Sequence, residues 1–478
     1  MPAKPETPRF VTGSTMRHVL VMASTGAVGL IAVFAVDLLN LFYISLLGQR
    51  PIAAAVGFSG VVNFLQTSVA IGLMIGVSAT VSRTIGAGRM EEARRIATSS
   101  LVVLTVLMLA LGLATVAALG PLLSLLGATG QTRTLADMFL RITSPSLPLL
   151  SAGMCLSGLL RSVGDARRAM SVTLTAAFVT AGLDPLLIFG LHLGLTGAAI
   201  STVMSRWVVV GIGLYNATRR HRLLGPFVPA ALPGDMRAVF AIAGPAVLTN
   251  LATPVGASYV THSMAAFGTA AVAGQATIDR ISPVAFGLVY ALTGAVGPIL
   301  AQNLGAGRTD RVAAALRDSL VFVVVAVTVA WAVLAAAQGG IVIAFSATGE
   351  TAVLIRLFCT WLAGSFLFTG SLFVANTAFN NLGFPLLSTA FNWGRATLGT
   401  IPFVTIGAGW GPEGILVGLA AGSVVFGVAA AVTAFRVVHR LDASAAVEHE
   451  MADHLAGGTA ATALAMVARR HLMRAAGR

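Results

Sequence analysis

The chain has 478 residues, of which 56% are apolar and only 10% are charged. A soluble domain carries about 25% charged residues, so this composition excludes an ordinary soluble enzyme and a disordered chain. The net formal charge is +13, but the arginines lie between apolar runs, which indicates membrane topology and not nucleic-acid binding. Cys155 and Cys359 lie within apolar runs and indicate neither a disulfide framework nor a metal site. The sequence therefore predicts a polytopic membrane protein.

Twelve apolar runs are long enough to cross a membrane, which takes about 20 residues in a helix. In chain order they cover residues 17–41, 55–80, 97–120, 138–160, 169–190, 194–217, 238–262, 281–301, 319–345, 353–375, 386–410 and 413–436. The first run is too long for a signal peptide and follows a polar, Pro-rich segment, so we expect it to be retained. The fold class predicted is an all-α protein with twelve transmembrane helices.

The arginines predict the orientation of these helices. With a cytoplasmic N-terminus, five basic residues lie on the outer side and two, Arg206 and Arg395, lie within spans, which leaves 23 of the 30 on the cytoplasmic side. Arg161 is among those assigned to cytoplasmic segments. Because basic residues in short loops stay in the cytoplasm, we expect a plasma-membrane protein with both termini cytoplasmic.

The two halves of the chain share motifs. Gly-Ala-Gly-Arg occurs at residues 86–89 and at 305–308, an offset of 219 that also pairs Gly164 with Gly383. An offset of 217 pairs Pro185 with Pro402. These anchors predict a parallel repeat of two six-helix bundles around a central cavity, an architecture suited to alternating access. The predicted division is an N-terminal segment at 1–16, bundles at 17–217 and 238–436, a linker at 218–237 and a cytoplasmic tail at 437–478.

Two acids lie deep within predicted spans, where an ionisable side chain is costly and marks a candidate functional site. They are Asp37 on the first span and Asp184 on the fifth. Polar residues at neighbouring positions on the same faces or at similar depth are Asn40, Thr180, Ser201 and Thr202. The repeat carries Asp37 onto Gly256 and Asp184 onto Ile401, so only the N-terminal bundle has these acids. Carboxylates in a low dielectric bind protons, and with hydroxyl or amide oxygens they also suit Na⁺, so both ions stay open.

The motifs of the chain resemble those of the multidrug and toxic compound extrusion (MATE) family over residues 15–440. They are Val-Asp at 36–37, the two Gly-Ala-Gly-Arg turns, Leu-Arg-Ser-Val-Gly-Asp at 160–165, Leu-Asp-Pro-Leu-Leu-Ile-Phe-Gly at 183–190 and Gly-Ala-Ala-Ile-Ser-Thr at 197–202. Their order and spacing across twelve spans make the resemblance specific.

The resemblance implies a V of two bundles that exports drug-like, cationic organic molecules in exchange for H⁺ or Na⁺. Its cation site falls on Asp37, Asp184 and Thr202, and Thr180 stands where the family commonly has Asn. The stretch 247–259 lacks the acid of another branch, which favours the branch with coupling acids in the N-terminal bundle. We expect a monomer in contact with membrane lipids, with no cofactor, no nucleic-acid partner and no enzymatic activity.

Further polar or adaptable residues are candidates for the substrate cavity: Met154, Tyr259, Gln275, Asp279, Arg280, Asn376 and Asn380. For the adjacent Asp279 and Arg280 the alternative is a self-neutralising pair at the outer edge, and for the two asparagines it is helix–helix hydrogen bonding. The residues at 458–475 predict a tail segment on the anionic inner leaflet or a disordered one.

A flippase for lipid-linked oligosaccharide is the alternative function. Such a protein is expected to have more spans and a basic cavity, whereas here two arginines within spans stand against two acids.

Overall fold

The computed structural model describes residues 8–47 and 50–456, and every regular element in that part of the chain is helical. Eleven stretches are long and apolar enough to cross a membrane, and the last of them, Pro385–Ser444, covers both the eleventh and the twelfth predicted span. The prediction of an all-helical protein with twelve spans is confirmed. The tail segment 458–475 lies outside the described residues.

The first half of the chain forms α1 (Thr15–Leu46), α2 (Arg50–Gly86), α3 (Met90–Ala117), α4 (Leu119–Leu125), α5 (Gly130–Thr143), α6 (Leu147–Ser162), α7 (Ala166–Pro185) and α8 (Gly194–Tyr215). The second half forms α9 (Leu232–Ala265), α10 (Thr269–Ala285), α11 (Gly287–Gly305), α12 (Thr309–Ala344), α13 (Gly349–Thr360), α14 (Phe366–Leu382), α15 (Pro385–Ala396), α16 (Ile401–Gly407) and α17 (Gly411–Ala456). A short 3₁₀ helix, Arg9–Val11, precedes α1.

Several predicted spans contain two consecutive helices. The fourth, predicted at 138–160, is α5 followed by α6; the eighth, at 281–301, is α10 followed by α11; the tenth, at 353–375, is α13 followed by α14; and the eleventh, at 386–410, is α15 followed by α16. α5 and α10 lie largely before the predicted start of their spans, whereas most of α13 lies inside its span. In the eighth span the reason is polarity, because Gln275, Asp279 and Arg280 interrupt the apolar run that a sequence window detects.

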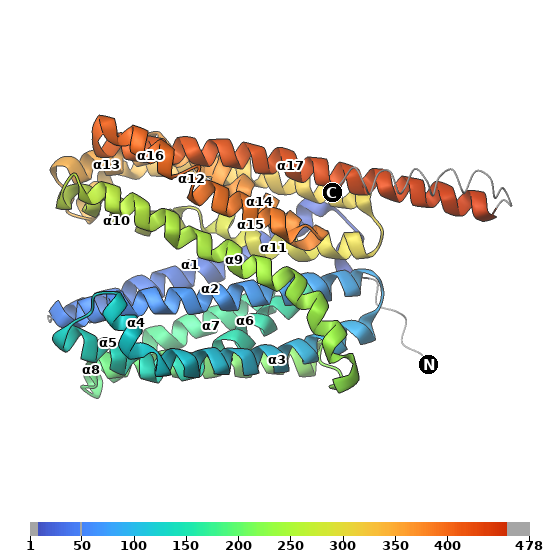
Figure 1. The fold of residues 1–478 in the computed structure, drawn as a ribbon, viewed down its shortest axis with the longest axis horizontal. Coiled ribbons are helices and arrows are strands. Elements are labelled where there is room, and N and C mark those ends of the chain that lie inside the picture. Colours follow the sequence, from blue (N-terminus) through green and yellow to red (C-terminus); the bar gives the residue numbers. More distant parts are fainter. Residues whose placement is uncertain (1–7, 48–49, 457–478) are drawn as a thin grey trace.

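The helices gather in two groups, with α1–α8 in one and α10–α17 in the other, and α9 crosses between them (Figure 1). Val239 and Ala243, near the start of α9, pack in the core of the first group, whereas Val260 and Met264, near its end, pack in the core of the second. α9 begins at Leu232, inside the segment predicted as a linker. This helix therefore connects the two groups through packing as well as through the chain.

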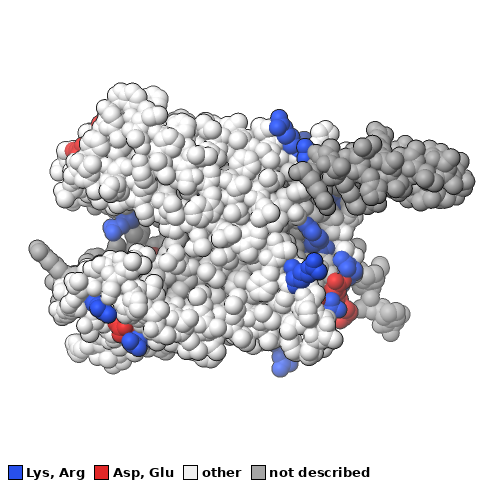
Figure 2. Space-filling view, in the orientation of Figure 1, with Lys and Arg blue, Asp and Glu red and all other residues white. Residues whose placement is uncertain are grey.

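The surface has the distribution of polarity that a membrane requires. Charged side chains gather at the two ends of the face in Figure 2 and leave a wide band between them without charge. Large apolar side chains stay exposed on the spanning helices, among them Phe178 on α7, Val333 on α12 and Val428 on α17. Lipid tails cover such side chains as well as a protein core does. α1 begins and α17 ends at the same end of the molecule (Figure 1).

At that end the two groups meet through the repeated Gly-Ala-Gly-Arg turns. A Cβ atom on Gly86 would lie 2.1 Å from the Gln302 carbonyl oxygen, and one on Gly305 would lie 2.1 Å from the Arg83 carbonyl oxygen. Only glycine permits this approach of α2 and α11. We call the region formed by residues 83–89 and 302–308 the closed end.

Two hydrogen bonds at the closed end repeat the same relation. Arg83 Nη2 donates to the Asn381 carbonyl oxygen over 2.7 Å, and Gln302 Nε2 donates to the Ser162 carbonyl oxygen over 2.6 Å. The donors are 219 residues apart, and so are the acceptors. Each half of the chain thus reaches across to the equivalent point of the other half.

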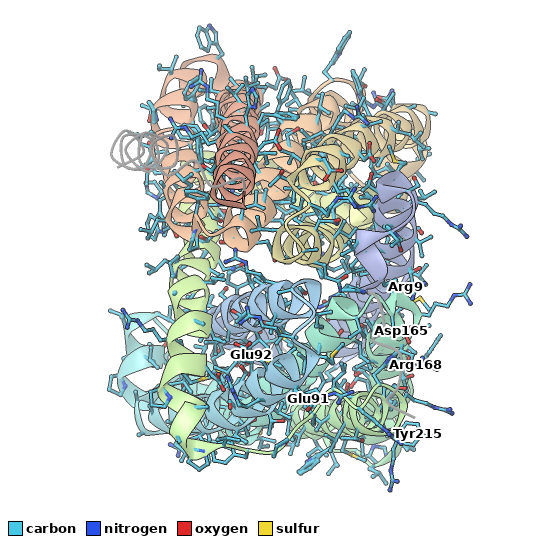
Figure 3. All side chains as sticks on the ribbon, turned by 90° about the vertical axis from the view of Figure 1, so that its right-hand side faces the viewer. Arg9, Glu91, Glu92, Asp165, Arg168 and Tyr215 are labelled. Atoms are coloured by element: carbon cyan, nitrogen blue, oxygen red, sulfur yellow. The ribbon has the colours of Figure 1, made fainter. Side chains whose placement is uncertain are left out.

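The segment before α1 adds a third connection at the closed end. The Phe10 backbone N–H donates to Gln302 Oε1 over 3.0 Å, Asn303 Nδ2 donates to the Phe10 carbonyl oxygen over 3.2 Å, and Arg9 Nη1 donates to the Gly164 carbonyl oxygen over 2.9 Å. Figure 3 looks onto this end and shows Arg9 close to Asp165 and Arg168. The N-terminal segment therefore ties the second group to the first.

Candidate functional site

A cavity of about 950 Å³ lies between the two groups of helices. Its wall includes residues of α1, α2, α6, α7 and α8 from the first group and of α10, α11, α14, α15 and α17 from the second. This volume is at the upper end of the range for ligand-binding cavities, roughly 300–1,000 Å³. The cavity is therefore large enough for an organic molecule and is shared by both halves of the chain.

Three arginines line this cavity: Arg161 from α6, Arg206 from α8 and Arg395 from α15. Asp279 of α10 is the single acid among the described residues of the lining. The Asp279 carboxylate accepts a hydrogen bond from Gln275 Nε2 at 2.9 Å, and it forms no ion pair with a described residue. The lining therefore carries an excess of positive charge.

The three guanidinium groups are held differently. Arg206 Nη1 donates to the Thr143 carbonyl oxygen over 2.9 Å and to Ser146 Oγ over 2.6 Å, at the junction of α5 and α6. Arg161 Nη2 lies 3.2 Å from Met74 Sδ. The Nε atom of Arg395 is buried without a hydrogen-bond partner, and its guanidinium forms no ion pair within the described part of the chain. Arg161 and Arg395 are therefore the two arginines of the lining whose charge no described carboxylate or oxygen acceptor compensates.

Aromatic side chains form one wall of the cavity around Tyr290 of α11. The Tyr290 ring centroid lies 5.4 Å from that of Phe373, 5.8 Å from that of Phe366 and 6.3 Å from that of Phe34. These rings come from α1, α11 and α14, so both groups supply them. Tyr290 is also within electrostatic reach of Arg395 and Asp279. The wall therefore combines flat apolar rings with charged groups nearby.

The lining also holds amides with unused hydrogen-bonding capacity. The side-chain oxygens of Gln275, Asn376 and Asn380 are buried without a hydrogen-bond partner among the described residues. Five of the seven predicted cavity residues line the cavity: Met154, Gln275, Asp279, Asn376 and Asn380.

The other two predicted cavity residues do not line it. The Tyr259 hydroxyl hydrogen-bonds with Thr405 Oγ1 at 2.6 Å. Arg280 is exposed and forms no ion pair with Asp279, so the two neighbours are not a self-neutralising pair in this structure. One helical step of about 100° turns their side chains apart.

Asp184 lies on α7 with 1% of its surface exposed. Neither of its carboxylate oxygens has a well-oriented hydrogen-bond donor among the described residues. The polar side chain next to this carboxylate is Ser201 of α8, whose hydroxyl is also buried. An unpaired buried carboxylate costs several kcal/mol, which makes Asp184 a candidate for binding a proton or a cation.

Asp37 lies level with Asp184 on the adjacent helix. α1 and α7 pack together with Gly29 against Thr173 and Tyr43 against Phe189, pairs that lie 144 and 146 residues apart in the sequence. The same spacing places Asp37 beside residues 181–183. Asp37 itself is exposed, one turn beyond Phe34 of the cavity wall. Asp37 is therefore level with Asp184 but is not one of the described residues that line the cavity.

The remaining predicted cation ligands lie at a similar depth. Thr180 precedes Asp184 by one turn, and the pairing of Ser205 Oγ with the Ala176 carbonyl oxygen at 3.4 Å places Thr202 of α8 near the same level. Thr202 Oγ1 donates to the Ala198 carbonyl oxygen at 2.9 Å within its own helix. The Asn40 side-chain oxygen is buried without a partner.

Arg161 is the cavity residue that the sequence placed elsewhere. It lies in the last turn of α6, and a Cβ atom on Gly294 of α11 would lie 3.4 Å from its Nε atom. The side chain therefore crosses to the second group inside the cavity and does not extend into a loop. The sequence did offer one indication that Arg161 lies within the membrane: it directly follows the predicted span 138–160, and span boundaries are uncertain by a few residues. The aromatic wall had no such signal, because cavity-facing and lipid-facing rings look alike in an apolar sequence.

Comparison with known proteins agrees with this architecture. The MatE family matches residues 27–186 and 245–406 of the chain. A protein of Shewanella oneidensis named FAD transporter is 30% identical over 90% of this chain and 96% of its own length. The probable multidrug resistance protein NorM of Deinococcus radiodurans is 28% identical over 63% of this chain and 67% of its own length. The crystal structure of the MATE transporter VcmN of Vibrio cholerae, in mutant form, has a TM-score of 0.85 at 24% identity and covers 88% of this chain and 96% of that one.

The match to the family extends over both halves of the chain, and the FAD transporter of Shewanella oneidensis aligns over nearly its whole length. The helical spans, the central cavity between two groups of helices and the sequence relationship lead to the same conclusion. The chain belongs to the MATE family of multi-pass membrane transporters of small organic molecules.

Proposed function

We propose that this protein is an antiporter of the plasma membrane that couples entry of H⁺ or Na⁺ to export of organic molecules by alternating access. Both termini lie in the cytoplasm in this proposal, so the closed end faces the cytoplasm. The observation that carries it is Asp184, a carboxylate buried in the first bundle with both oxygens unpartnered. We assign the coupling site to the N-terminal bundle.

The chemistry of coupling follows from the cost of that buried charge. Binding of a proton or Na⁺ neutralises the site and removes the desolvation penalty, which is several kcal/mol. Asp37, exposed and at the same level, is placed to pass the ion to Asp184. A conformation in which the site is occupied therefore differs in free energy from one in which it is empty, and that difference biases which end of the cavity is open.

The charge of the cargo is a separate question from the coupling ion. The resemblance predicted cationic, drug-like molecules, whereas the cavity has three arginines and one acid in its described lining. The similar proteins include multidrug resistance proteins and an FAD transporter, and FAD carries phosphate groups. We therefore propose organic molecules of drug size as cargo and disfavour cations among them.

The basic cavity also favours the second candidate, a flippase for lipid-linked oligosaccharide, more than the sequence alone did. Such lipids carry phosphate beside a long hydrocarbon chain. A flippase moves its lipid between leaflets without exchanging it for an ion gradient, so the two functions separate in one assay.

The test uses the protein reconstituted in vesicles, with ΔpH and ΔNa⁺ imposed separately and with ethidium or FAD as cargo. Asp184→Asn and Asp37→Asn are expected to lower gradient-driven export at least about tenfold, within the usual range of coupling free energies. Asp310→Asn, which changes a carboxylate 61% exposed at a helix start, is the matched control.

Failure of both gradients to drive either cargo would overturn the antiport proposal. Wild-type transport by both Asn variants would overturn the site assignment. The flippase would instead be established if a fluorescent polyprenyl diphosphate moved between the leaflets at the same rate with and without a gradient.

A further inference from the structure

We propose that the central cavity binds an aromatic anion that bears phosphate, with Arg395 and Arg206 facing the phosphate and the Tyr290 wall facing the ring. The inference rests on the proposed transport function, because it names the chemical class of the cargo. It depends on three independent features of the cavity: its charge, an arginine without a partner and a cluster of aromatic rings.

The partnerless arginine is the first step. A buried cation costs several kcal/mol unless an anion or a full set of acceptors compensates it. Arg206 has two acceptors from the protein, whereas Arg395 has none for its buried Nε atom within the described structure. The counter-ion of Arg395 is therefore expected from the cargo.

Asp279 does not supply that counter-ion. Its carboxylate accepts a hydrogen bond from Gln275 and lies farther than 4.0 Å from every described guanidinium nitrogen. Three arginines against one acid leave a positive field in a space with low-dielectric walls, where charge interactions are strong. A cationic cargo would be repelled by that field, and a neutral one would leave Arg395 uncompensated.

Arginine also indicates which anion. The guanidinium group presents a planar set of donors that matches phosphate in a bidentate arrangement and is more weakly hydrated than an ammonium group. All three basic residues of the described lining are arginines, although this is expected in a chain with a single lysine. The argument for phosphate therefore comes from the positive charge of the cavity together with the unused Nε donor of Arg395.

The rest of the lining fits an aromatic body attached to that phosphate. The ring centroids of Phe366 and Phe373 each lie within 6 Å of that of Tyr290, and Tyr290 is within electrostatic reach of Arg395. A planar ligand ring stacks favourably on such a wall, as nucleic-acid bases do on aromatic side chains. The unpartnered oxygens of Asn376 and Asn380 accept hydrogen bonds from ring or sugar donors. A nucleoside diphosphate has all of these groups and fits within 950 Å³.

The test measures, by fluorescence anisotropy, the binding of fluorescent probes to the purified full-length protein in detergent. The probes are ethenoadenosine diphosphate, ethenoadenosine and ethidium, which share a planar aromatic body and differ in charge. We expect the diphosphate to bind at least tenfold more tightly than the nucleoside, and ethidium to bind more weakly than either.

Arg395→Gln is the decisive variant, because it removes the charge without breaking a hydrogen bond that the protein makes. It should weaken binding of the diphosphate about tenfold or more and leave the nucleoside within about twofold, as expected for loss of one charge-assisted contact. Arg395→Lys should recover part of the loss. Arg356→Gln, at an exposed arginine outside the cavity, should bind like the wild type.

Equal affinity for diphosphate and nucleoside, or a diphosphate affinity that Arg395→Gln leaves unchanged while the variant elutes as a folded protein, would overturn the inference. The two proposals can fail separately. If the diphosphate binds in an Arg395-dependent way but no ion gradient drives transport, the proposed antiport is overturned and the cavity assignment stands. Geranylgeranyl diphosphate as competitor separates the two sources of phosphate: competition tenfold stronger than that of ADP assigns the site to a lipid headgroup and overturns the aromatic part of the inference.

Discussion

The closed end and the cavity treat the two halves of the chain in opposite ways. At the closed end, Arg83 and Gln302 occupy repeat-related positions and make equivalent hydrogen bonds across the interface. In the cavity, the repeat partner of Arg161 is Asn380 and that of Arg206 is Ser423, and all four residues line the wall. Packing that shuts one end is needed equally from both halves, so it stays alike. The cavity positions have no such common requirement, so their side chains differ between the halves.

Arg395 and Asp184 show the difference most clearly. The repeat partner of Arg395 is Ala176, which lines the cavity from α7, and that of Asp184 is Ile401. An equivalent backbone position therefore carries a charge in one half and an apolar side chain in the other. The shared backbone tolerates both because the surroundings, and not the helix itself, decide the cost of the charge.

The largest effect is expected from breaking the symmetric contact of the glycines. Gly86→Leu or Gly305→Leu places side-chain atoms where a backbone carbonyl lies 2.1 Å from the Cβ position, so α2 and α11 must separate. Overpacking of this kind costs about 3 kcal/mol, which lowers the population of the closed end about a hundredfold. The measurement is the rate at which a polar maleimide labels a cysteine at position 162, which is fully buried in the wild type.

Gly57→Leu is the matched control, because a Cβ atom there meets nothing within 4 Å. Slow labelling of position 162 in both the Gly86 and the Gly305 variant would show that the two glycines do not hold the closed end together. The two native cysteines are buried and report any general loosening of the fold.

A smaller effect is expected from the paired hydrogen bonds. Arg83→Ala and Gln302→Ala each leave a carbonyl oxygen without its donor, at a cost of about 1–3 kcal/mol. Gln302→Ala also leaves the Phe10 N–H without its acceptor, so it should raise labelling at position 162 more than Arg83→Ala does. The double variant should raise labelling by the product of the two factors if the sites are independent. Arg356→Ala, at an exposed position, controls for loss of an arginine. A larger effect of Arg83→Ala than of Gln302→Ala would contradict this account.

The smallest effect concerns a place at the closed end where the halves differ. Asp165 caps α7 by accepting a hydrogen bond from the Arg168 backbone N–H at 3.0 Å, whereas its repeat partner Phe384 gives α15 no side-chain cap. Burial raises the pKa of Asp165, but hydrogen bonds from Arg168 and His221 outweigh it and hold the pKa below its ordinary value. Asp165→Asn removes the charge from this cluster.

The sign of the pH dependence follows from that lowered pKa. The carboxylate stabilises the folded state above its ordinary pKa, and the contribution is lost as the pH falls through the lowered one. At pH 7 we expect Asp165→Asn to cost about 1 kcal/mol, measured by thermal unfolding in detergent, and the difference from wild type to shrink as the pH approaches 3. Glu91→Gln, whose side chain is 81% exposed, should show no such trend; a constant difference for Asp165→Asn would contradict the assignment.

The sequence by itself determined the class, the number of spans, their order and the repeat. These follow from run length and hydropathy, which the thickness of a bilayer sets. It also singled out Asp184, because a buried acid is rare enough in an apolar chain to be seen without a structure. The domain boundaries and the cation-binding role of Asp37, Asp184 and their neighbours stay predictions.

The tertiary structure alone decided which faces of the helices meet. It placed Arg161 inside the cavity, turned Tyr259 away from it and gave the Gly-Ala-Gly-Arg turns their role at the closed end. The physical reason is that lipid and protein core are both apolar, so a spanning helix shows little contrast between its faces and its sequence does not reveal its rotation. The excess of positive charge in the cavity also depends on the tertiary structure, because the three arginines that cause it come from different helices.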